Sequence, residues 1–268
     1  MKFSKSVAAI ALAGLCATLS RAEENERNAT VEIGFDLATA YVASGATIND
    51  SFVFQPFIDI YDLKIGDIAL PIEFDVWANM DLDDYDKVPE DTDPGRFSEV
   101  DFQVRLNLAS MFGWDDVSLY IGYLEYDYPL AGGDADNVFD AKVGYSFTSG
   151  EGDDKETLCS TSLRLKYRIG GPSEDKYELF FDINRGFDFS DTLGGKIGCE
   201  FVYINVDELD GCETDSGFAC ADIYAKVFFG DFTLACTYVS RLDDEVLPSG
   251  AYGYDAKWIG TFGWCHAF

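Results

Sequence analysis

The feature that most constrains this chain is a strict alternation of polar and apolar residues in unusually long runs. In residues 71–82 the even positions from Ile72 to Leu82 are apolar, and most odd positions are polar or charged. Residues 99–108 repeat the pattern. Because successive side chains of a strand point to opposite faces, both runs predict strands with one apolar and one charged face. They are longer than ordinary strands and match the ~9–11 residues that a tilted strand needs to cross a bilayer.

Alternation of this kind recurs along the chain. The candidate strands are residues 31–44, 51–64, 71–82, 99–108, 117–128, 139–147, 162–168, 178–184, 194–204, 222–229, 232–241 and 258–268. The acidic stretch 83–96 holds Pro89, Pro94 and Gly95 and predicts a loop. No stretch after the N-terminal segment reaches 18 apolar residues, so we expect no transmembrane helix. The predicted fold class is all-β, a single antiparallel transmembrane β-barrel of about 12 strands.

The N-terminal segment has the layout of a secretory signal peptide. Lys2 and Lys5 precede an apolar run at residues 7–19, and Ser20 and Ala22 supply small residues at the −3 and −1 positions of a cleavage site. The apolar run is too short to span a bilayer as a helix. We therefore expect a signal peptide at 1–22 and one mature domain at 23–268.

Two architectures use long alternating strands, and they differ in which face meets water. A soluble barrel buries its apolar face, whereas a transmembrane barrel turns that face to lipid and its polar face to a lumen. Charged polar faces, a last strand that ends on Phe268 and aromatic residues near strand ends favour the bacterial outer membrane. The aromatic residues that we expect in interfacial girdles are Tyr123, Tyr126, Tyr128, Trp258, Phe262 and Trp264.

Charge and aromatic content narrow the function classes. The chain has 49 acidic and 19 basic side chains, and its formal net charge of −30 repels nucleic-acid phosphates. An aromatic content of 15% excludes an intrinsically disordered acidic chain. The single histidine, His266, lies near the C-terminus without a serine nucleophile motif beside it. We expect no enzyme activity, no catalytic residue and no cofactor.

Five segments of the chain have a distinctive sequence: "AYVASGATINDSFVFQP", "VWANMDLDD", "FSEVDFQVRL", "YIGYLEYDYP" and "VFDAKVGYSF". Together they resemble the TorF-type porin family of bacterial outer-membrane proteins. The likeness covers residues 34–147, with residues 122–129 as its most specific part, and the remainder by strand pattern. The six cysteines after residue 22 and the tail "GWCHAF" depart from the family. The resemblance implies a β-barrel with a pore role in a Gram-negative bacterium and supplies no catalytic residues.

The charged faces of the expected strands supply the candidate functional residues. The candidate lumen and selectivity residues are Glu73, Asp75, Asp81, Glu99, Asp101, Arg105, Arg164, Lys166, Arg168, Glu178 and Asp182. An acidic wall on residues 73–101 that faces a basic row on residues 164–168 makes a transverse field, which can select hydrated solutes. Alternatively, the same charges pair across strands and fill the barrel, with the basic row bridging to Glu178 and Asp182. The sequence leaves both interpretations open.

Acidic residues also gather in the expected loops, where calcium is the first ligand to consider. Residues 81–86 lack the glycine at the sixth position, and Thr92 stands where an EF-hand loop has its carboxylate at the twelfth. A chain with one histidine and no CxxC pair also offers no zinc site. We expect no metal and interpret the acidic loops as solvated rims.

Six cysteines follow residue 22, at positions 159, 199, 212, 220, 236 and 265. Export permits disulfides, and Cys212 and Cys220 lie in one loop region, so we predict a bridge between them. Cys159, Cys199 and Cys236 fall on apolar faces, where a small apolar side chain is the simpler interpretation. The pairing of these three residues and Cys265 does not follow from the sequence.

The sequence therefore predicts an outer-membrane barrel for passive diffusion of small hydrophilic solutes or ions, with a preference for cations. The expected partners are membrane lipid and small hydrophilic solutes or cations, without nucleic acid, and a homo-oligomer is left open. Two alternatives remain. One is a non-conducting structural or surface-interaction barrel, and the other is a soluble secreted barrel that binds an apolar ligand.

Overall fold

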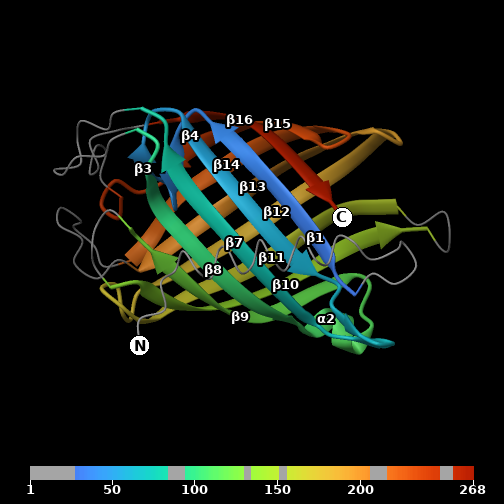
Figure 1. Cartoon of the computed structure of the whole chain (residues 1–268). Coiled ribbons are helices and arrows are strands. Elements are labelled where there is room, and N and C mark those ends of the chain that lie inside the picture. The colour runs from blue at the N-terminus through green and yellow to red at the C-terminus, as the bar shows by residue number, and fades with distance from the viewer. Residues whose placement is uncertain (1–27, 84–93, 130–133, 151–155, 206–215, 248–255) are drawn as a thin grey trace.

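The computed structural model describes residues 28–83, 94–129, 134–150, 156–205, 216–247 and 256–268. Twelve antiparallel strands among them form one closed barrel, in which β1 pairs with β16 to complete the ring (Figure 1). The barrel strands are β1 (Thr30–Ala38), β4 (Val53–Tyr61), β7 (Ile72–Asp81), β8 (Phe97–Asn107), β9 (Val117–Asp127), β10 (Asp136–Ser149), β11 (Glu156–Gly170), β12 (Tyr177–Ser190), β13 (Leu193–Asn205), β14 (Ser216–Phe229), β15 (Phe232–Arg241) and β16 (Trp258–Ala267). The predicted all-β fold and strand number are confirmed.

The chain between β1 and β4 leaves the wall of the barrel. Here β2 (Tyr41–Ala43) and β3 (Ala46–Asn49) pair with each other as a separate hairpin, at the left-hand end of the barrel in Figure 1. The turn residues Ser44 and Gly45 have φ angles of 48° and 84°, and two positive φ angles favour a tight hairpin turn. The prediction of one strand over residues 31–44 was wrong, because β1 ends at Ala38 and residues 41–43 form the first strand of the hairpin.

The two ends of the barrel are built differently. The loop end carries the β2–β3 hairpin, the connections at residues 94–96 and 171–176, and the segment 242–247. The turn end carries the hairpin of β5 (Lys64–Ile65) and β6 (Ile68–Ala69), the helix α2 (Leu108–Phe112), and two-residue connections at 191–192 and 230–231.

Helix α2 departs from the strand that the alternation predicts up to residue 108. The side chain of Asn107 accepts a hydrogen bond from the Ser110 backbone at 3.1 Å, which caps the first turn of the helix. Gly113 ends the helix with a φ of 64°. None of the helices among the described residues combines the length and apolar character needed to cross a membrane.

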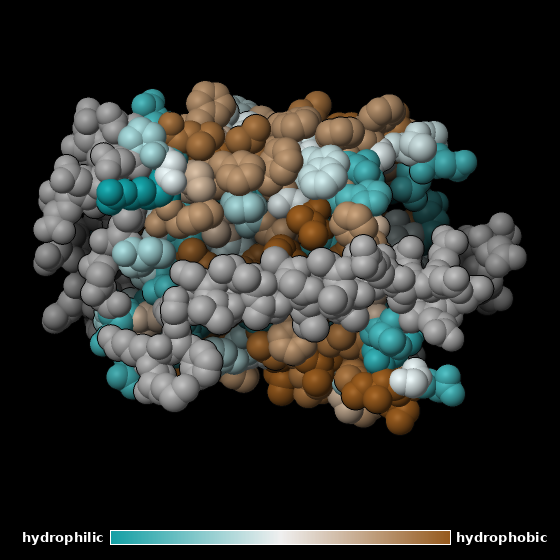
Figure 2. Space-filling model, viewed as in Figure 1, coloured by the Kyte–Doolittle hydropathy of each residue, from teal (hydrophilic) through white to brown (hydrophobic). Residues whose placement is uncertain are grey.

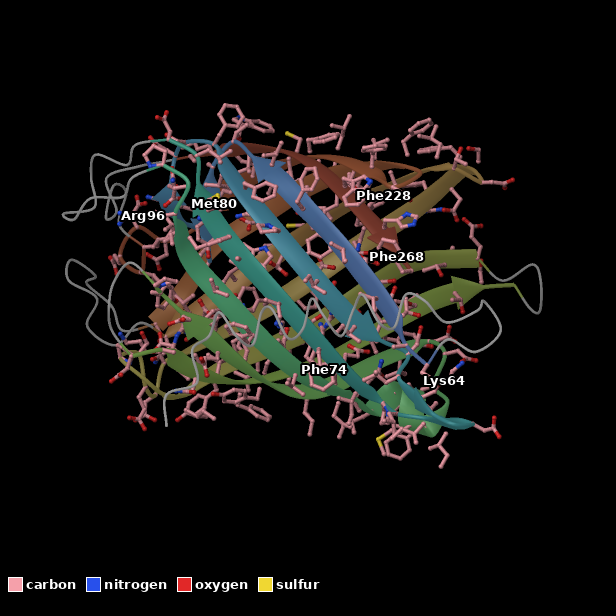
Figure 3. All side chains as sticks on the ribbon, in the orientation of Figure 1. Lys64, Phe74, Met80, Arg96, Phe228 and Phe268 are labelled. Atoms are coloured by element: carbon pink, nitrogen blue, oxygen red, sulfur yellow. The ribbon has the colours of Figure 1, made fainter. Side chains whose placement is uncertain are left out.

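The middle of the outer surface is apolar. Val104, Val143, Leu163 and Ile223 are 43%, 49%, 45% and 53% exposed. Figure 2 shows apolar side chains over the middle of the barrel and hydrophilic ones toward its two ends. Figure 3 accordingly places Arg96 and Lys64 at opposite ends, with Phe74 between them. The alternation therefore sends apolar side chains outward and charged side chains into the barrel.

Aromatic rings gather on the outer surface near both ends of the strands. At the loop end, the rings of Trp258 and Tyr238 lie 4.8 Å apart. At the turn end, the His266 ring lies 6.5 Å from Trp264 and 4.8 Å from Phe268. These are the positions where interfacial girdles occur in membrane barrels.

Two residues expected in a girdle, Tyr126 and Tyr128, lie inside the barrel instead, and Tyr128 packs against the buried residues Leu124, Tyr126 and Val138. Tyr126 is 7% exposed, and its hydroxyl accepts a hydrogen bond from Lys166 Nζ at 2.6 Å. The cause is strand parity, because Tyr126 shares the inward face of β9 with Leu124, whereas Tyr123 is 40% exposed on the outward face.

Candidate functional site: the barrel lumen

The register of the strands decides which charged side chains meet inside the barrel. Opposite residues on paired strands share a face, so their side chains are neighbours. Glu73 lies opposite Arg105, for example, whereas Asp182 lies opposite Glu200. The result is a set of paired charges that reaches from the turn end of β7 and β8 to the loop end of the later strands, and an open cavity at the turn end of those later strands.

Arg105 on β8 neutralises acidic residues of β7. Its Nε lies 3.3 Å from Glu73 Oε2, and its Nη2 pairs with Asp75 Oδ1. Asn107 donates a further hydrogen bond to Glu73 at 2.9 Å. The acidic wall expected from the sequence is therefore balanced in part by a cation on the neighbouring strand.

Asp140 on β10 is a fully buried charge, with no exposed surface. Arg164 binds it in a bidentate manner, since Nε and Nη2 each donate to a different carboxylate oxygen at 2.8 Å. Gln103 donates another hydrogen bond to the same carboxylate. A buried carboxylate requires such partners because it has lost its hydration, and this group links β8, β10 and β11 inside the barrel.

The other two residues of the basic row are also engaged. Arg168 lies 3.5 Å from Glu178 Oε2 through Nη1 and 3.7 Å from Asp136 Oδ2 through Nε. Lys166 Nζ donates to the Tyr126 hydroxyl and lies 5.2 Å from the centre of the Phe180 ring. The basic row therefore holds together β9, β10, β11 and β12.

The β2–β3 hairpin is bonded to carboxylates on three different barrel strands. Tyr41 Oη donates to Glu99 Oε2 at 2.6 Å, Ser44 Oγ donates to Glu178 Oε1 at 2.6 Å, and Asn49 Nδ2 donates to Asp81 Oδ1 at 2.7 Å. Because these acceptors lie on β8, β12 and β7, the hairpin reaches across the lumen. Burial and the neighbouring Glu99 carboxylate raise the pKa of Tyr41 well above 10, so its hydroxyl keeps the proton that it donates.

The hairpin also packs against an apolar cluster at the loop end. The buried members are Ala46, Val202, Ile204, Ala219, Cys220, Val239, Val246 and Leu247. A Cβ atom on Gly45 would lie 2.8 Å from Cys220 Cβ, so the turn fits closely against the wall. With Thr47 and Asn49 at 1% and 2% exposure, the hairpin fills this half of the lumen.

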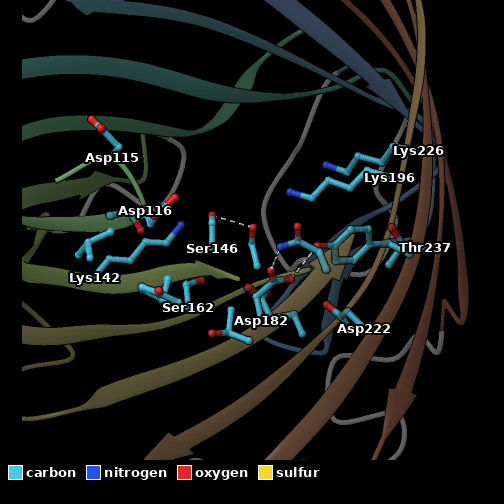
Figure 4. Close-up of a pocket in the computed structure, with 18 residues that line it drawn as sticks. Asp115, Asp116, Lys142, Ser146, Ser162, Asp182, Lys196, Asp222, Lys226 and Thr237 are labelled. Atoms are coloured by element: carbon cyan, nitrogen blue, oxygen red, sulfur yellow. Dashed lines mark hydrogen bonds between the residues drawn. The ribbon is translucent and has the colours of Figure 1, made fainter. Parts of the chain in front are cut away.

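At the turn end the lumen opens into a cavity of about 610 Å³, which we call the vestibule (Figure 4). Most of its wall comes from β10 to β14, the longest strands, with 13 to 15 residues each. Its charged side chains are Asp115, Asp116, Lys142, Asp182, Lys196, Glu200, Asp222 and Lys226. The vestibule therefore offers both cationic and anionic groups to water.

These side chains form rows across β12, β13 and β14. The first row is Asp182, Glu200 and Asp222, the second is Asn184, Gly198 and Tyr224, and the third joins Lys196 to Lys226. Each row lies two residues closer to the turn end than the one before it. A row of carboxylates and a pair of lysines thus line one cavity, separated by a neutral row.

Several vestibule charges have no partner of opposite sign. In the part of the chain that the structure describes, no ion pair joins Lys142, Lys196 or Lys226 to a carboxylate. Asp222 Oδ1 is buried without a hydrogen-bond donor. Asp182 differs, since it accepts a hydrogen bond from the Tyr224 hydroxyl at 2.7 Å. The carboxylate and lysine rows are therefore available to a solute.

The candidate residues named from the sequence all lie on inward faces of the barrel strands. Seven of them lie in the loop-end half, whereas Glu73, Asp75 and Arg105 lie near the turn end of β7 and β8, and Asp182 lines the vestibule. The proposed bridge from the basic row to Glu178 is present, whereas Asp182 bonds to Tyr224 instead. Whether these residues select solutes stays a prediction.

Sequence reasoning did not single out the fully buried Asp140, and of the vestibule charges it named Asp182 alone. Asp140, Asp222 and Lys226 do occupy polar positions of alternating runs, so the signal for their inward orientation was present. The alternation does not indicate which of these side chains contact each other. The hairpin left one local signal, the Ser44-Gly45 pair, because serine followed by glycine is typical of a turn.

Five cysteines lie among the described residues, namely Cys159, Cys199, Cys220, Cys236 and Cys265, and all are free thiols. Cys159, Cys199 and Cys236 are free thiols that line an apolar hollow on the outer surface. Cys220 is a free thiol in the loop-end cluster. Its predicted partner, Cys212, lies outside the described residues, so that bridge stays a prediction.

The single histidine of the chain lies outside the lumen. His266 lies on the outer surface, where its Nδ1 is 2.9 Å from Asp231 Oδ2. Among the described residues no group of three His, Cys, Asp or Glu side chains is arranged to hold a metal ion.

No family model and no curated protein matches the chain, so the resemblance to TorF-type porins stays a prediction. The solved structures with some similarity to the chain include two porins. The NanC porin has a TM-score of 0.46 at 9% identity, over 89% of this chain and 98% of that chain. A triple mutant of the Rhodopseudomonas blastica porin has a TM-score of 0.29 at 12% identity, over 90% and 99%. At TM-scores below 0.5 these likenesses assign neither a family nor a function.

Proposed function

We propose that this chain is a porin-like barrel of the bacterial outer membrane through which small hydrophilic solutes diffuse passively. The observation that carries the proposal is the polarity of the wall, which is apolar over the middle of its outer surface and charged inside. Lipid solvates the first face and water the second. The vestibule provides room for a hydrated solute at the turn end. The expected signal peptide, at residues 1–22 and outside the described residues, agrees with export.

The proposal includes a preference for cations. Inward carboxylates outnumber inward cations on the barrel strands. The carboxylates are Glu32, Asp36, Asp59, Glu73, Asp75, Asp81, Glu99, Asp101, Asp136, Asp140, Glu178, Asp182, Asp188, Glu200 and Asp222, and the cations are Arg105, Lys142, Arg164, Lys166, Arg168, Lys196, Lys226 and Arg241. A lumen with this surplus attracts cations and repels anions along its axis.

Passage through the barrel requires the β2–β3 hairpin to move, because it fills the loop-end half of the lumen. Hydrogen bonds to charged groups contribute roughly 1.5–3 kcal/mol each, and Tyr41 and Ser44 supply two of them. Among the described residues, β2 and β3 pair with each other and not with the wall, to which they are bonded through hydrogen bonds that involve side chains. We therefore assign it the role of a gate that opens intermittently.

Recordings from the refolded chain in a planar bilayer under a salt gradient test the proposal. We expect discrete conductance steps and a reversal potential that favours cations. The double variant Tyr41→Phe/Ser44→Ala removes two donors and should raise the open fraction while the sign of the reversal potential stays the same. Tyr238→Phe removes a hydroxyl from the outer surface and serves as the matched control, with an unchanged open fraction.

A second candidate is a non-conducting structural barrel. The observation in its favour is that Asn79 and Asp140, in the loop-end half, have no exposed surface at all. If the inserted protein stays silent both as the natural chain and as the double variant, the gate assignment fails and this candidate replaces the first.

A soluble barrel that binds an apolar ligand needs the opposite arrangement. Its interior would be apolar and its outer surface charged. Here Ile223 and Leu234 are 53% and 61% exposed on the outer surface, and Asp140 is buried inside. The soluble alternative is therefore not part of the proposal.

A further inference from the structure

The vestibule combines a lysine pair with a carboxylate row, and neither set is neutralised by the other. Lys196 and Lys226 lie directly opposite each other on β13 and β14, and Figure 4 shows both side chains extending into the cavity. Like charges placed directly opposite in a sheet are destabilising. The repulsion between like charges is present at the two lysines. It is also present at Glu200 and Asp222, which lie opposite each other as well.

A bound solute of suitable charge would offset the repulsion within both pairs. A carboxylate between Lys196 and Lys226 accepts hydrogen bonds from two ammonium groups. An ammonium group near Glu200 and Asp222 donates to carboxylates, and Asp222 Oδ1 is buried without a donor. A solute that carries both groups satisfies both sets at once.

The distance between the lysine pair and the carboxylate row determines the size of that solute. Lys196 and Glu200 are four residues apart on one face of β13, which separates their Cα atoms by roughly 13 Å at ~3.3 Å per residue. Both side chains are long enough to reduce this gap by several ångströms. Gly198 lies between them, and the ring of Tyr224 covers it, since a Cβ there would lie 2.4 Å from the Tyr224 hydroxyl oxygen. The neutral row thus presents a hydroxyl and an amide to the middle of the solute.

We propose that the vestibule is a binding site for small zwitterions of the amino-acid or short-peptide class. The solute carboxylate binds Lys196 and Lys226, and its ammonium group binds Glu200 and Asp222. The binding site deepens the proposed function and rests on it, because a channel brings solutes to the vestibule.

Calorimetric titration of the refolded barrel in detergent, with glycylglycine as the probe, tests this site. Two half-charged analogues are the comparison: N-acetylglycine, which carries the carboxylate alone, and glycinamide, which carries the ammonium group alone. We expect glycylglycine to bind at least about tenfold more tightly than either analogue, because each analogue forms only one of the two sets of charge-assisted bonds.

Two double variants assign the ends of the site. Lys196→Met/Lys226→Met should weaken glycylglycine binding about tenfold or more and leave glycinamide binding unchanged. Glu200→Gln/Asp222→Asn should weaken glycylglycine equally and leave N-acetylglycine binding unchanged. Lys64→Met, on an exposed residue of β5 outside the vestibule, is the control and should change nothing. Circular dichroism establishes that each variant forms the barrel.

Three outcomes overturn the inference: equal binding of glycylglycine and N-acetylglycine, equal binding of glycylglycine and glycinamide, or no binding of any probe by a folded barrel. Conductance of the same preparation keeps the two proposals apart. A barrel that conducts and binds no glycylglycine overturns the binding site alone. A barrel that binds glycylglycine and never conducts overturns the proposed channel alone.

Discussion

The two halves of the lumen are built by strands with the same alternation, yet their charged side chains are arranged differently. In the loop-end half unlike charges lie opposite each other, as Asp140 does with Lys166 and Lys166 with Glu178. In the vestibule like charges lie opposite, as Glu200 does with Asp222. The first arrangement fills the barrel and the second leaves it open. The register between strands, more than their composition, therefore decides whether a charged lumen is closed.

The largest expected difference between the halves concerns their buried carboxylates. Asp140→Asn leaves Arg164 without its charged partner and should lower the free energy of unfolding by about 3 kcal/mol. Asp222→Asn removes a like charge from an unpaired row, so its stability should stay the same or rise. Urea unfolding of the folded barrel in micelles measures both. Equal losses for the two variants would show that the halves do not differ in this way.

A smaller difference is expected at two glycines with positive φ. Gly45 in the hairpin has a φ of 84° and Gly66 in the β5–β6 turn has a φ of 59°. Alanine costs roughly 1–2 kcal/mol at either site through the backbone. At position 45 the added Cβ atom would also lie 2.8 Å from Cys220 Cβ, whereas an added Cβ atom at position 66 would have no neighbouring atom within 4 Å. Gly45→Ala should therefore also loosen the hairpin and raise the open fraction in bilayer recordings, and an identical rise in Gly66→Ala would contradict the gate.

The smallest effect is expected from the lysine pair. Lys196→Met removes one of two opposed ammonium groups and should raise stability by about 0.5 kcal/mol. Lys64→Met, at an exposed position with no opposed lysine, should leave stability unchanged. Parallel urea titrations at low and high salt provide the measurement. The gain at Lys196 should shrink at high salt, because salt screens the repulsion that the variant removes.

The sequence predicted the wall of the barrel because a strand has a fixed period of two. Once residues 71–82 are placed as a strand, the face of every residue in it follows. The end of β1 did not follow in the same way, since residues 37–43 are apolar except for Thr39 and contain no turn residue before the Ser44-Gly45 pair. Helix α2 was missed because its five residues are too few to display helical periodicity.

The contacts inside the lumen were harder to predict than the faces. Arg168 and Glu178 were found because they lie on consecutive strands of the chain. The pair of Arg164 with Asp140 depends on the register of β10 with β11, where irregularities occur after Asn137 and after Phe147. An irregularity of this kind shifts all later pairs by one residue, and alternation contains no information about it. The vestibule depends on the same register and was not foreseen.

The hairpin bonds have a consequence for how the barrel would discriminate between ions. Tyr41, Ser44 and Asn49 are neutral donors, and each covers a carboxylate of the wall, namely Glu99, Glu178 or Asp81. A hairpin that swings away takes no positive charge with it and uncovers all three carboxylates at the mouth. Opening would thus expose these carboxylates to passing ions, while Glu178 keeps its ion pair with Arg168. Permeation and discrimination would then arise from one and the same movement.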